Sequence, residues 1–451
     1  MTPIDDSELR HASLCRQLHL LASGEVTASR LTAVYLSAIE AENPSLRAFY
    51  CVDAEGARAA ATASDARRHA GTTVGRLDGV AIAIKDNLDV AGLPTTAGLA
   101  ARRHHRAPAD AFAVARLRAA GAVILGKTAL DEAALGAMGS NAAFGNVPNP
   151  QRPAQASGGS SSGSAVAVAA GLCSAALGSD TLGSLRIPAA FCDIYALRPT
   201  LGEVSCSGLW PALPRLDAVG PITRSLDDLN VLLQVLAAHD PADPRSRRRR
   251  VPLALPDWEP GRLRSGVASQ LAALGADATV VAAFGSALQR LQPLLGERRE
   301  VALTGFGLPR LRRAALLMME AGLAAADPAD LLELSSERRQ MLAFASSKSA
   351  VDYARADRLL DAAVVSMRRL FDAVDVLLLP TVPLPPPLLA AAEPANLADF
   401  TALASIAGCP ALSLPLGAGI GLQLVGPPGS DLRLLELGQV TAALLEAPEL
   451  A

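Results

Sequence analysis

A serine- and glycine-rich segment, SGGSSSGS at 157–164, runs without a break into the small apolar stretch AVAVAA at 165–170. Because the segment has no bulky side chains, its backbone can come close to another loop or to a ligand. A flexible serine-rich linker has a similar composition, but such linkers rarely lead directly into an apolar helix. We therefore expect a tightly packed loop that continues into a buried helix of small residues.

A lysine ends the apolar run of a second segment, AIAIKDNLDVAGLPTTAG at 81–98. Residues 81–84 are predicted to form a fully buried strand, and burial favours the uncharged amine of Lys85. A neutral lysine can remove the proton of a serine hydroxyl, which is otherwise a poor nucleophile. A strand-end lysine that reaches water or pairs with Asp86 is the simpler interpretation for this segment alone. The serine-bearing segments favour the catalytic interpretation.

A third segment, LGSDTLGSLRIPAAF at 177–191, carries Ser184 in a turn flanked by glycine. Consecutive backbone N–H groups in such a turn can converge on a developing oxyanion. A plain strand-to-loop turn is the alternative. Together the three segments indicate a serine nucleophile activated without histidine, and hence hydrolysis of an amide bond.

The three segments resemble those of the amidase signature family, whose members show an IAIKDN-like, a GGSSGGS and a DTGGSIRxPA segment. Further segments also resemble the family: GAVILGKTALDEAALG (121–136), YALRPTLG (195–202), LDAVGPITRSLDDL (216–229), DVLLLPTVPLP (375–385) and LASIAGCPALSLPLG (403–417). The resemblance implies a single α/β domain over 1–451, with a mixed, twisted central sheet flanked by helices. Its catalytic core would span about 75–230, and a diverged substrate-pocket region about 240–370.

The resemblance also implies roles for individual residues. Ser184 is the expected acyl-enzyme nucleophile, Lys85 the general base, and Ser160 a bridging serine preceded by a cis peptide bond. The expected oxyanion hole consists of the backbone N–H groups of Thr181, Leu182, Gly183 and Ser184. The expected substrate-binding residues are Met138, Gly139 and Ser161.

Three positions depart from the family pattern. Ser162 and Leu182 each stand where a glycine is usual, and Asp193 stands where a small or neutral residue is more frequent. A side chain at 182 excludes the left-handed backbone conformations that glycine permits. Either the local backbone accepts a β-carbon, or the oxyanion hole is altered.

Two other motifs match catalytic or binding patterns. GAVILGKT at 121–128 fits the GxxxxGK[ST] phosphate loop, but its apolar interior predicts a strand, whose N–H groups are used in pairing instead of turning toward a phosphate. GSSSG at 159–163 fits the GxSxG elbow with Ser161 as nucleophile, but the only later histidine is His239, beside a polar segment. Histidine and cysteine clusters that would hold a catalytic zinc are also missing.

Composition and charge narrow the classes of function that stay open. Half of the 451 residues are hydrophobic and the net charge is −3, so nucleic-acid binding has no global electrostatic support. The basic run at Arg245 and 247–250 is predicted to be a solvated loop. No apolar run approaches the roughly 18 residues that cross a bilayer. With an acidic start and six scattered cysteines, these features predict a cytoplasmic protein without a metal or other cofactor.

Three functions stay open. The favoured one is a stand-alone hydrolase of a small amide, ureide or carbamate. The second is a subunit that hydrolyses glutamine and passes ammonia to a partner, similar to the glutamine-hydrolysing subunit of glutamyl-tRNA amidotransferase; Leu182 and the short, diverged C-terminal half count against it. The third is a nucleotide-binding or scaffold protein that uses GAVILGKT. Two kinds of protein partner also stay open: a second copy in a homodimer and a small helical accessory subunit.

Overall fold

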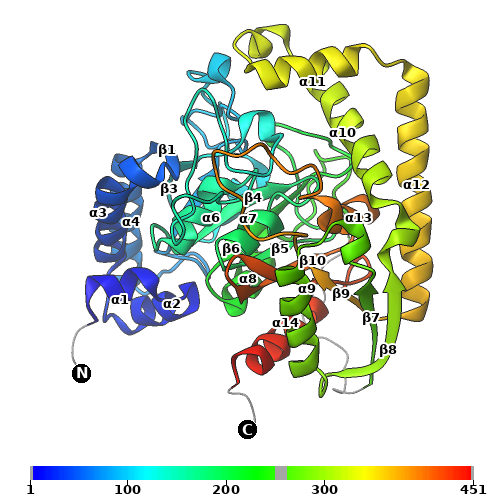
Figure 1. The fold of residues 1–451 in the computed structure, drawn as a ribbon. Helices are drawn as coiled ribbons and strands as arrows, with labels where there is room; N and C mark the ends of the chain where they lie inside the picture. The colour runs from blue at the N-terminus through cyan, green and yellow to red at the C-terminus, as the bar shows by residue number, and fades with distance from the viewer. Residues whose placement is uncertain (1–3, 249–261, 448–451) are drawn as a thin grey trace.

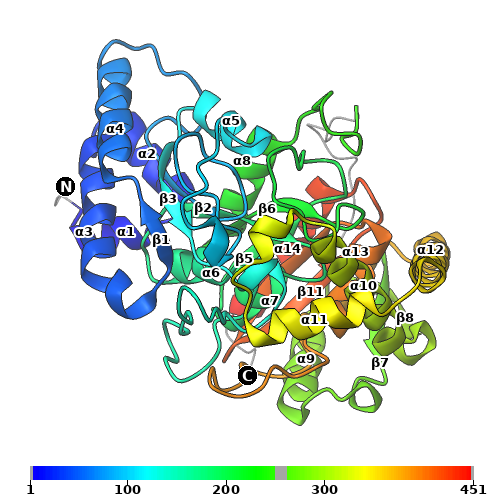
Figure 2. The ribbon, with the colours of Figure 1, turned by 90° about the horizontal axis from the view of Figure 1, so that it is seen from above.

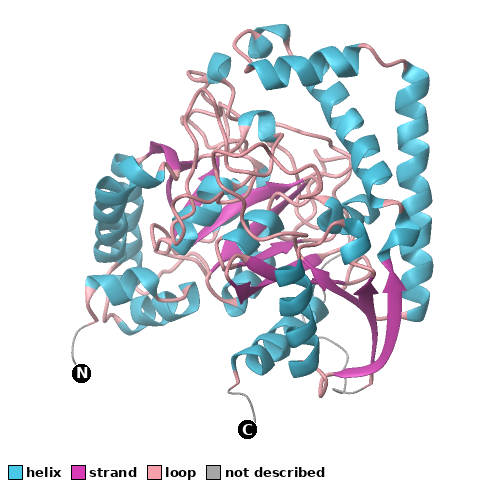
Figure 3. Cartoon of the chain, viewed as in Figure 1, coloured by secondary structure: helices cyan, strands magenta, loops and turns pink. Residues whose placement is uncertain are grey.

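Eleven strands form one mixed sheet in the computed structural model, which describes residues 4–248 and 262–447 (Figures 1 and 3). Residues 1–3, and Arg249 and Arg250 of the basic run, lie outside these ranges. The strand order is β1-β3-β2-β4-β6-β5-β10-β11-β9-β7-β8. The strands are β1 (Phe49–Val52), β2 (Ala81–Lys85), β3 (Val123–Thr128), β4 (Ala175–Asp180), β5 (Tyr195–Arg198), β6 (Ala218–Thr223), β7 (Leu263–Ser269), β8 (Leu295–Ala302), β9 (Val376–Pro380), β10 (Ala411–Gly417) and β11 (Ile420–Val425).

Helices cover both faces of the sheet. Consecutive residues of a strand point to opposite faces, and on β10 Leu412 lies next to Gly438 of α14 while Ser413 lies on the face that carries Ala190 of α7. The helices are α1 (Asp6–His11), α2 (Leu14–Ser23), α3 (Ala28–Leu46), α4 (Ala54–His69), α5 (Phe112–Ala119), α6 (Ser162–Ala169), α7 (Arg186–Phe191), α8 (Leu226–Leu236), α9 (Ala278–Arg290), α10 (Leu308–Ala324), α11 (Ser336–Ser346), α12 (Ala350–Ala373), α13 (Asp399–Ala407) and α14 (Asp431–Glu446). The predicted α/β fold with a mixed central sheet is therefore confirmed.

The parallel pairing of β2 with β4 brings the three sequence segments together. Ile84 on β2 is in register with Leu177 on β4, so the carboxyl ends of both strands lie at the same edge of the sheet. Lys85 ends β2, and the turn that carries Ser184 follows β4. Between them, the serine-rich loop leads into α6, whose residues 162–168 are all buried, as the small side chains predict.

Residues 123–128 of GAVILGKT form strand β3 and no phosphate loop. Lys127 and Thr128 are in parallel register with Ile84 and Lys85 of β2. The ammonium of Lys127 is fully buried and forms an ion pair with Asp86 at 2.8 Å. The backbone of the motif is thus engaged in sheet pairing and its lysine in an internal ion pair, which excludes the nucleotide-binding alternative for this segment.

The segment from α10 to α12 forms an outer layer at one side of the sheet. Figure 2 shows α11 crossing above α7, which follows the Ser184 turn. This layer comes from the region, about 240–370, that the family resemblance predicts to form the substrate pocket. In the described ranges, no helix combines the length and apolar character that crossing a membrane requires.

Candidate active site

Lys85 lies completely inside the protein and contacts two serines. Its Nζ donates hydrogen bonds to Ser160 Oγ at 2.8 Å and to Ser179 Oγ at 2.9 Å. Burial lowers the pKa of Lys85 from its ordinary 10.5 to about 7, against the opposing effect of three nearby carboxylates. These carboxylates are Asp131, Asp180 and Asp217. A substantial fraction of Lys85 is therefore neutral near pH 7, as a general base requires.

Ser160 is held by close backbone packing. It is fully buried, and the Gly159–Ser160 peptide bond is cis, the geometry that the family resemblance implies. A β-carbon at Gly159 would lie 2.2 Å from an Asp131 carboxylate oxygen, and one at Gly158 would lie 2.6 Å from the Cα of Pro188. The two glycines are thus required because other backbone and side-chain atoms come too close for any side chain.

Ser184 is the candidate triad residue that faces a cavity. It is only half-buried, whereas Lys85 and Ser160 are fully buried. Its carbonyl accepts the N–H of Ser161 at 3.2 Å, which holds the turn against the serine-rich loop. This arrangement puts the Ser184 hydroxyl next to a cavity, and its backbone against the loop that carries Ser160, the partner of Lys85.

The turn at 181–184 accommodates Leu182 without strain. Leu182 is not among the described residues with positive φ, whereas Gly183 has φ +139°. The Thr401 hydroxyl donates to the carbonyl of Leu182 at 2.5 Å. Because C=O and N–H point in opposite directions across a trans peptide, the N–H of Gly183 points away from Thr401. The local backbone thus accepts a β-carbon at 182, the first of the two expected alternatives.

Buried charges anchor the strand end before this turn. The Asp180 carboxylate is paired with Arg186 at 2.9 Å and with Arg198 at 3.0 Å, and all three side chains are fully buried. Burial alone would raise the pKa of Asp180, but the two guanidinium groups lower it well below its usual range. The next residue, Thr181, donates its hydroxyl to Asp217 at 2.5 Å. The turn is therefore supported on both sides by fixed side chains.

The expected substrate-binding residues do not line the cavity next to Ser184. The N–H groups of Met138 and Gly139 point at the Asp131 carboxylate, at 3.3 Å and 3.1 Å. Ser161 is fully buried, and its hydroxyl donates to the Ser179 carbonyl at 3.1 Å. Met138 and Gly139 lie in a loop that turns its N–H groups toward Asp131, a buried acid that the sequence did not reveal.

The local backbone accepts both Ser162 and Asp193. Ser162 is the first residue of α6 and has an ordinary helical position. Asp193 has φ +52°, a conformation that asparagine and aspartate tolerate better than other residues with a side chain. Its carboxylate accepts from Arg152 at 2.8 Å and from the Gly419 N–H at 2.9 Å. Both departures lie outside the cavity wall.

A cavity of about 450 Å³ opens in front of Ser184. The Ser184 turn and the start of α7 form its floor. Helices α10 and α11 form its outer wall, and the rest comes from the loops at 134–137 and 393–398. Its lining includes Leu182, Gly183, Ser184, Ile187, Ala134, Leu135, Gly136, Ala137, Arg312, Arg313, Leu316, Met319, Glu320, Glu337, Arg338, Met341, Glu393, Ala395 and Ala398. A volume of this size suits a small molecule.

Two opposite charges in the cavity wall are incompletely paired. Arg338 is only 4% exposed, and its buried Nε has no hydrogen-bond partner within the described residues. Buried Glu320 likewise keeps one carboxylate oxygen without a partner there, and burial raises its pKa. Sequence reasoning missed both residues, because they lie in the part of the chain where no motif was recognisable. Both side chains line the cavity, so its wall presents a basic and an acidic group to a ligand.

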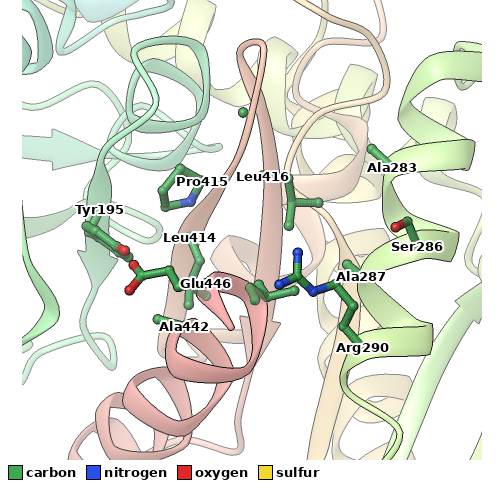
Figure 4. Close-up of a pocket in the computed structure, with 12 residues that line it drawn as sticks. Tyr195, Ala283, Ser286, Ala287, Arg290, Leu414, Pro415, Leu416, Ala442 and Glu446 are labelled. Atoms are coloured by element: carbon green, nitrogen blue, oxygen red, sulfur yellow. The ribbon is translucent and has the colours of Figure 1, made fainter. Parts of the chain in front are cut away.

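A second cavity, of about 380 Å³, lies away from these residues (Figure 4). It lies between the β10–β11 hairpin and helices α9 and α14. Tyr195 and Glu446 lie side by side at one end, and Arg290 comes from α9. None of the candidate triad residues lines it, so the cavity in front of Ser184 is the candidate active site.

The fold and the cavity next to Ser184 agree with a hydrolase of the amidase class. The family model named Amidase matches residues 30–435. The chain therefore belongs to the amidase signature family and is an amidohydrolase that acts on carbon–nitrogen bonds.

Individual relatives cover nearly the whole chain. A glutamyl-tRNA(Gln) amidotransferase subunit from Chloroflexus aurantiacus is 36% identical, over 98% of this chain and 98% of its own. A structure described as an unexpected vestigial protein complex that reveals the evolutionary origins of an s-triazine catabolic enzyme has a TM-score of 0.89 at 29% identity, covering 96% and 98%. A crystal structure of an amidase has a TM-score of 0.86 at 33% identity, covering 96% and 99%. The expected divergence of the C-terminal half therefore does not separate this chain from amidotransferase subunits.

Proposed function

We propose that Ser184, Ser160 and Lys85 act as a catalytic triad that cleaves a small amide through an acyl-enzyme. The observation that carries the proposal is the buried 2.8 Å hydrogen bond between Lys85 and Ser160, in the loop whose Ser161 N–H bonds the carbonyl of half-buried Ser184. Neutral Lys85 takes the Ser160 proton while Ser160 takes that of Ser184, whose Oγ attacks the amide carbon. The same path returns the proton to the leaving nitrogen as the C–N bond breaks, and water then hydrolyses the Ser184 ester.

Backbone N–H groups of the 181–184 turn stabilise the tetrahedral oxyanion in this mechanism. Thr401 fixes the carbonyl of Leu182, so the N–H of Gly183 is already oriented before substrate binds. Such preorganised donors stabilise charge that develops in the transition state without reorganisation. The turn therefore supplies the electrostatic part of catalysis, and the triad supplies the proton transfers.

A substrate with a carboxylate fits the cavity best. Arg338 offers a buried guanidinium nitrogen that has no partner among the described residues. Charge-assisted hydrogen bonds from arginine to carboxylates are among the strongest in proteins. Arg338 would hold the substrate's carboxylate while the scissile amide lies at Ser184.

Glutamine is the first candidate substrate, and the curated relatives favour it. The C. aurantiacus relative belongs to a glutamyl-tRNA(Gln) amidotransferase. Free glutamine carries an α-carboxylate and an α-ammonium, which complement the incompletely paired groups of Arg338 and Glu320 in the described ranges. In this case the released ammonia would be passed to a partner protein.

A small amide, ureide or carbamate with a carboxylate is the second candidate. It is favoured by the side chain of Leu182, which occupies space beside Ser184 where the family usually has glycine. The similarity to a structure connected with s-triazine catabolism and to an amidase agrees with such a substrate. For either candidate, a cytoplasmic location, independence of cofactors, and assembly as a homodimer or with a small helical accessory subunit stay as predictions.

Substrate profiling tests the proposal and separates the candidates. Purified protein is incubated with glutamine, carboxylated ureides, carbamates and aryl amides, and ammonia or amine release is measured for wild type and Ser184→Ala. Release from glutamine at a rate above that from ureides supports the first candidate, and the reverse supports the second. Equal release by wild type and Ser184→Ala would contradict the triad.

A further inference from the structure

A fourth buried side chain contacts the general base. Ser179, next to the last residue of β4, accepts a hydrogen bond from Lys85 Nζ at 2.9 Å and one from Asn87 Nδ2 at 3.0 Å. Its own carbonyl accepts from the Ser161 hydroxyl at 3.1 Å. Ser179 is 3% exposed and does not line the cavity. It therefore cannot bind substrate, and its hydroxyl acts on Lys85.

The donors and the lone pair of a neutral lysine explain how the contact with Ser179 affects Lys85. A neutral amine has two N–H donors and one lone pair, and only the lone pair can take a proton from Ser160. The hydroxyl oxygen of Ser179 has two acceptor positions, which Lys85 and Asn87 fill. With one N–H directed at Ser179, rotation of the amine is restricted and the lone pair stays available to Ser160.

We propose that Ser179, supported by Asn87, is a positioning residue that orients the Lys85 amine toward Ser160. The proposal rests on the triad proposed above. When Lys85 becomes protonated during turnover, Ser179 also accepts a bond from the resulting ammonium, which is fully buried. Loss of the Ser179 hydroxyl therefore disfavours the protonated amine more than the neutral amine.

Ser179→Ala tests this role through its pH profile. Hydrogen bonds to charged groups exceed neutral ones by about 1 kcal/mol, so the acid limb of kcat/KM should move to lower pH by roughly 0.7 pH units. Misorientation of the base should lower kcat by about 10- to 100-fold, while KM stays unchanged because Ser179 is outside the cavity. Ser179→Thr keeps the acceptor and should restore both values toward wild type. The charged groups that face Lys85 are Asp131, Asp180 and Asp217, and each variant retains all three.

Ser164→Ala is the matched control. Ser164 is also fully buried, and its hydroxyl bonds Thr128 Oγ1 at 2.7 Å and the Leu177 carbonyl at 2.9 Å, without contact to Lys85. This variant should keep the wild-type pH profile, and Asn87→Ala should shift it in the same direction as Ser179→Ala. If Ser179→Ala does not fold, Ser179→Cys, with a weak sulfur acceptor, replaces it.

The outcomes separate this proposal from the triad itself. An acid limb that stays at the wild-type pH in Ser179→Ala, or an equal shift in Ser164→Ala, overturns the positioning role. Full activity of Ser184→Ala overturns the triad, whatever Ser179 does. A shift in Ser179→Ala that Ser179→Thr reverses supports the proposal.

Discussion

Replacement of Lys85 by methionine should separate the stability cost of the buried amine from its use in catalysis. The pKa of Lys85 falls from 10.5 to about 7 on folding, so the unfolded chain binds more protons than the folded chain between these two pH values. As pH falls through this window, wild type loses about 1.4 kcal/mol of unfolding free energy for each pH unit. At and below pH 7 the buried Lys85 lowers the free energy of unfolding by its full amount, about 5 kcal/mol.

Methionine has a similar shape and carries no charge, so the Lys85→Met protein escapes this cost. It leaves the buried Ser160 hydroxyl without its lysine partner, at about 1 to 3 kcal/mol, and leaves Ser179 with Asn87, at about 0.5 to 1.5 kcal/mol. We therefore expect Lys85→Met to be more stable than wild type by about 0.5 to 3.5 kcal/mol at pH 7, even though it has lost turnover. The advantage should disappear between about pH 7.5 and 9.5 and reverse at higher pH, where only the loss of the hydrogen bonds remains.

Urea unfolding of both proteins at pH values of about 6.5, 8 and 9.5 measures this difference across the window in which the two states bind different numbers of protons. A stability difference that does not change with pH would refute the reasoning, because it would mean that Lys85 binds its proton equally in the folded and unfolded states. Lys127→Met is a useful contrast, since Lys127 is equally buried but paired with Asp86. Its removal leaves a buried carboxylate without its ion-pair partner and should destabilise the protein by about 3 to 5 kcal/mol.

Four further results are expected. Ser184→Ala should keep the fold by circular dichroism and lose at least about 10⁴-fold in kcat. In wild type, kcat/KM should rise with pH through an apparent pKa of about 7, and a Lys85→Ala protein with the same profile would show another base. Arg338→Gln should raise KM by about 10- to 100-fold for carboxylate-bearing substrates and leave neutral amides unaffected; an equal effect on both would exclude carboxylate binding. Leu182→Ala should favour bulkier acyl groups in relative kcat/KM, and uniform loss across acyl sizes would assign Leu182 to the turn alone.

Local sequence patterns predicted the elements that carry the candidate triad. The apolar run before Lys85 forms a fully buried strand, and the small residues after the serine-rich loop form a buried helix. Residues 123–128 of GAVILGKT form a fully buried strand, as their apolar residues predict. Such patterns predict a helix or strand correctly when its type and burial depend on neighbouring residues in the sequence.

The rest of the site depends on contacts between distant segments. Thr401 fixes the carbonyl of Leu182 across 219 residues of sequence. Arg338 reaches the cavity only because α11 crosses above α7. Met138 and Gly139 were expected at the substrate, but the Asp131 carboxylate draws their N–H groups inward. No pattern within a single segment contains these pairings, so the sequence could not predict the cavity wall.

Capture of the acyl-enzyme tests the central claim most directly. Wild type and Ser184→Ala are mixed with the best substrate from the profiling experiment, quenched in acid within the first turnovers, and analysed by intact-protein and peptide mass spectrometry. The account predicts a mass increase equal to the acyl group, located on Ser184 and absent from Ser184→Ala. An acyl adduct on Ser160, Ser161 or another residue, or efficient turnover with no adduct under rapid quench, would contradict it.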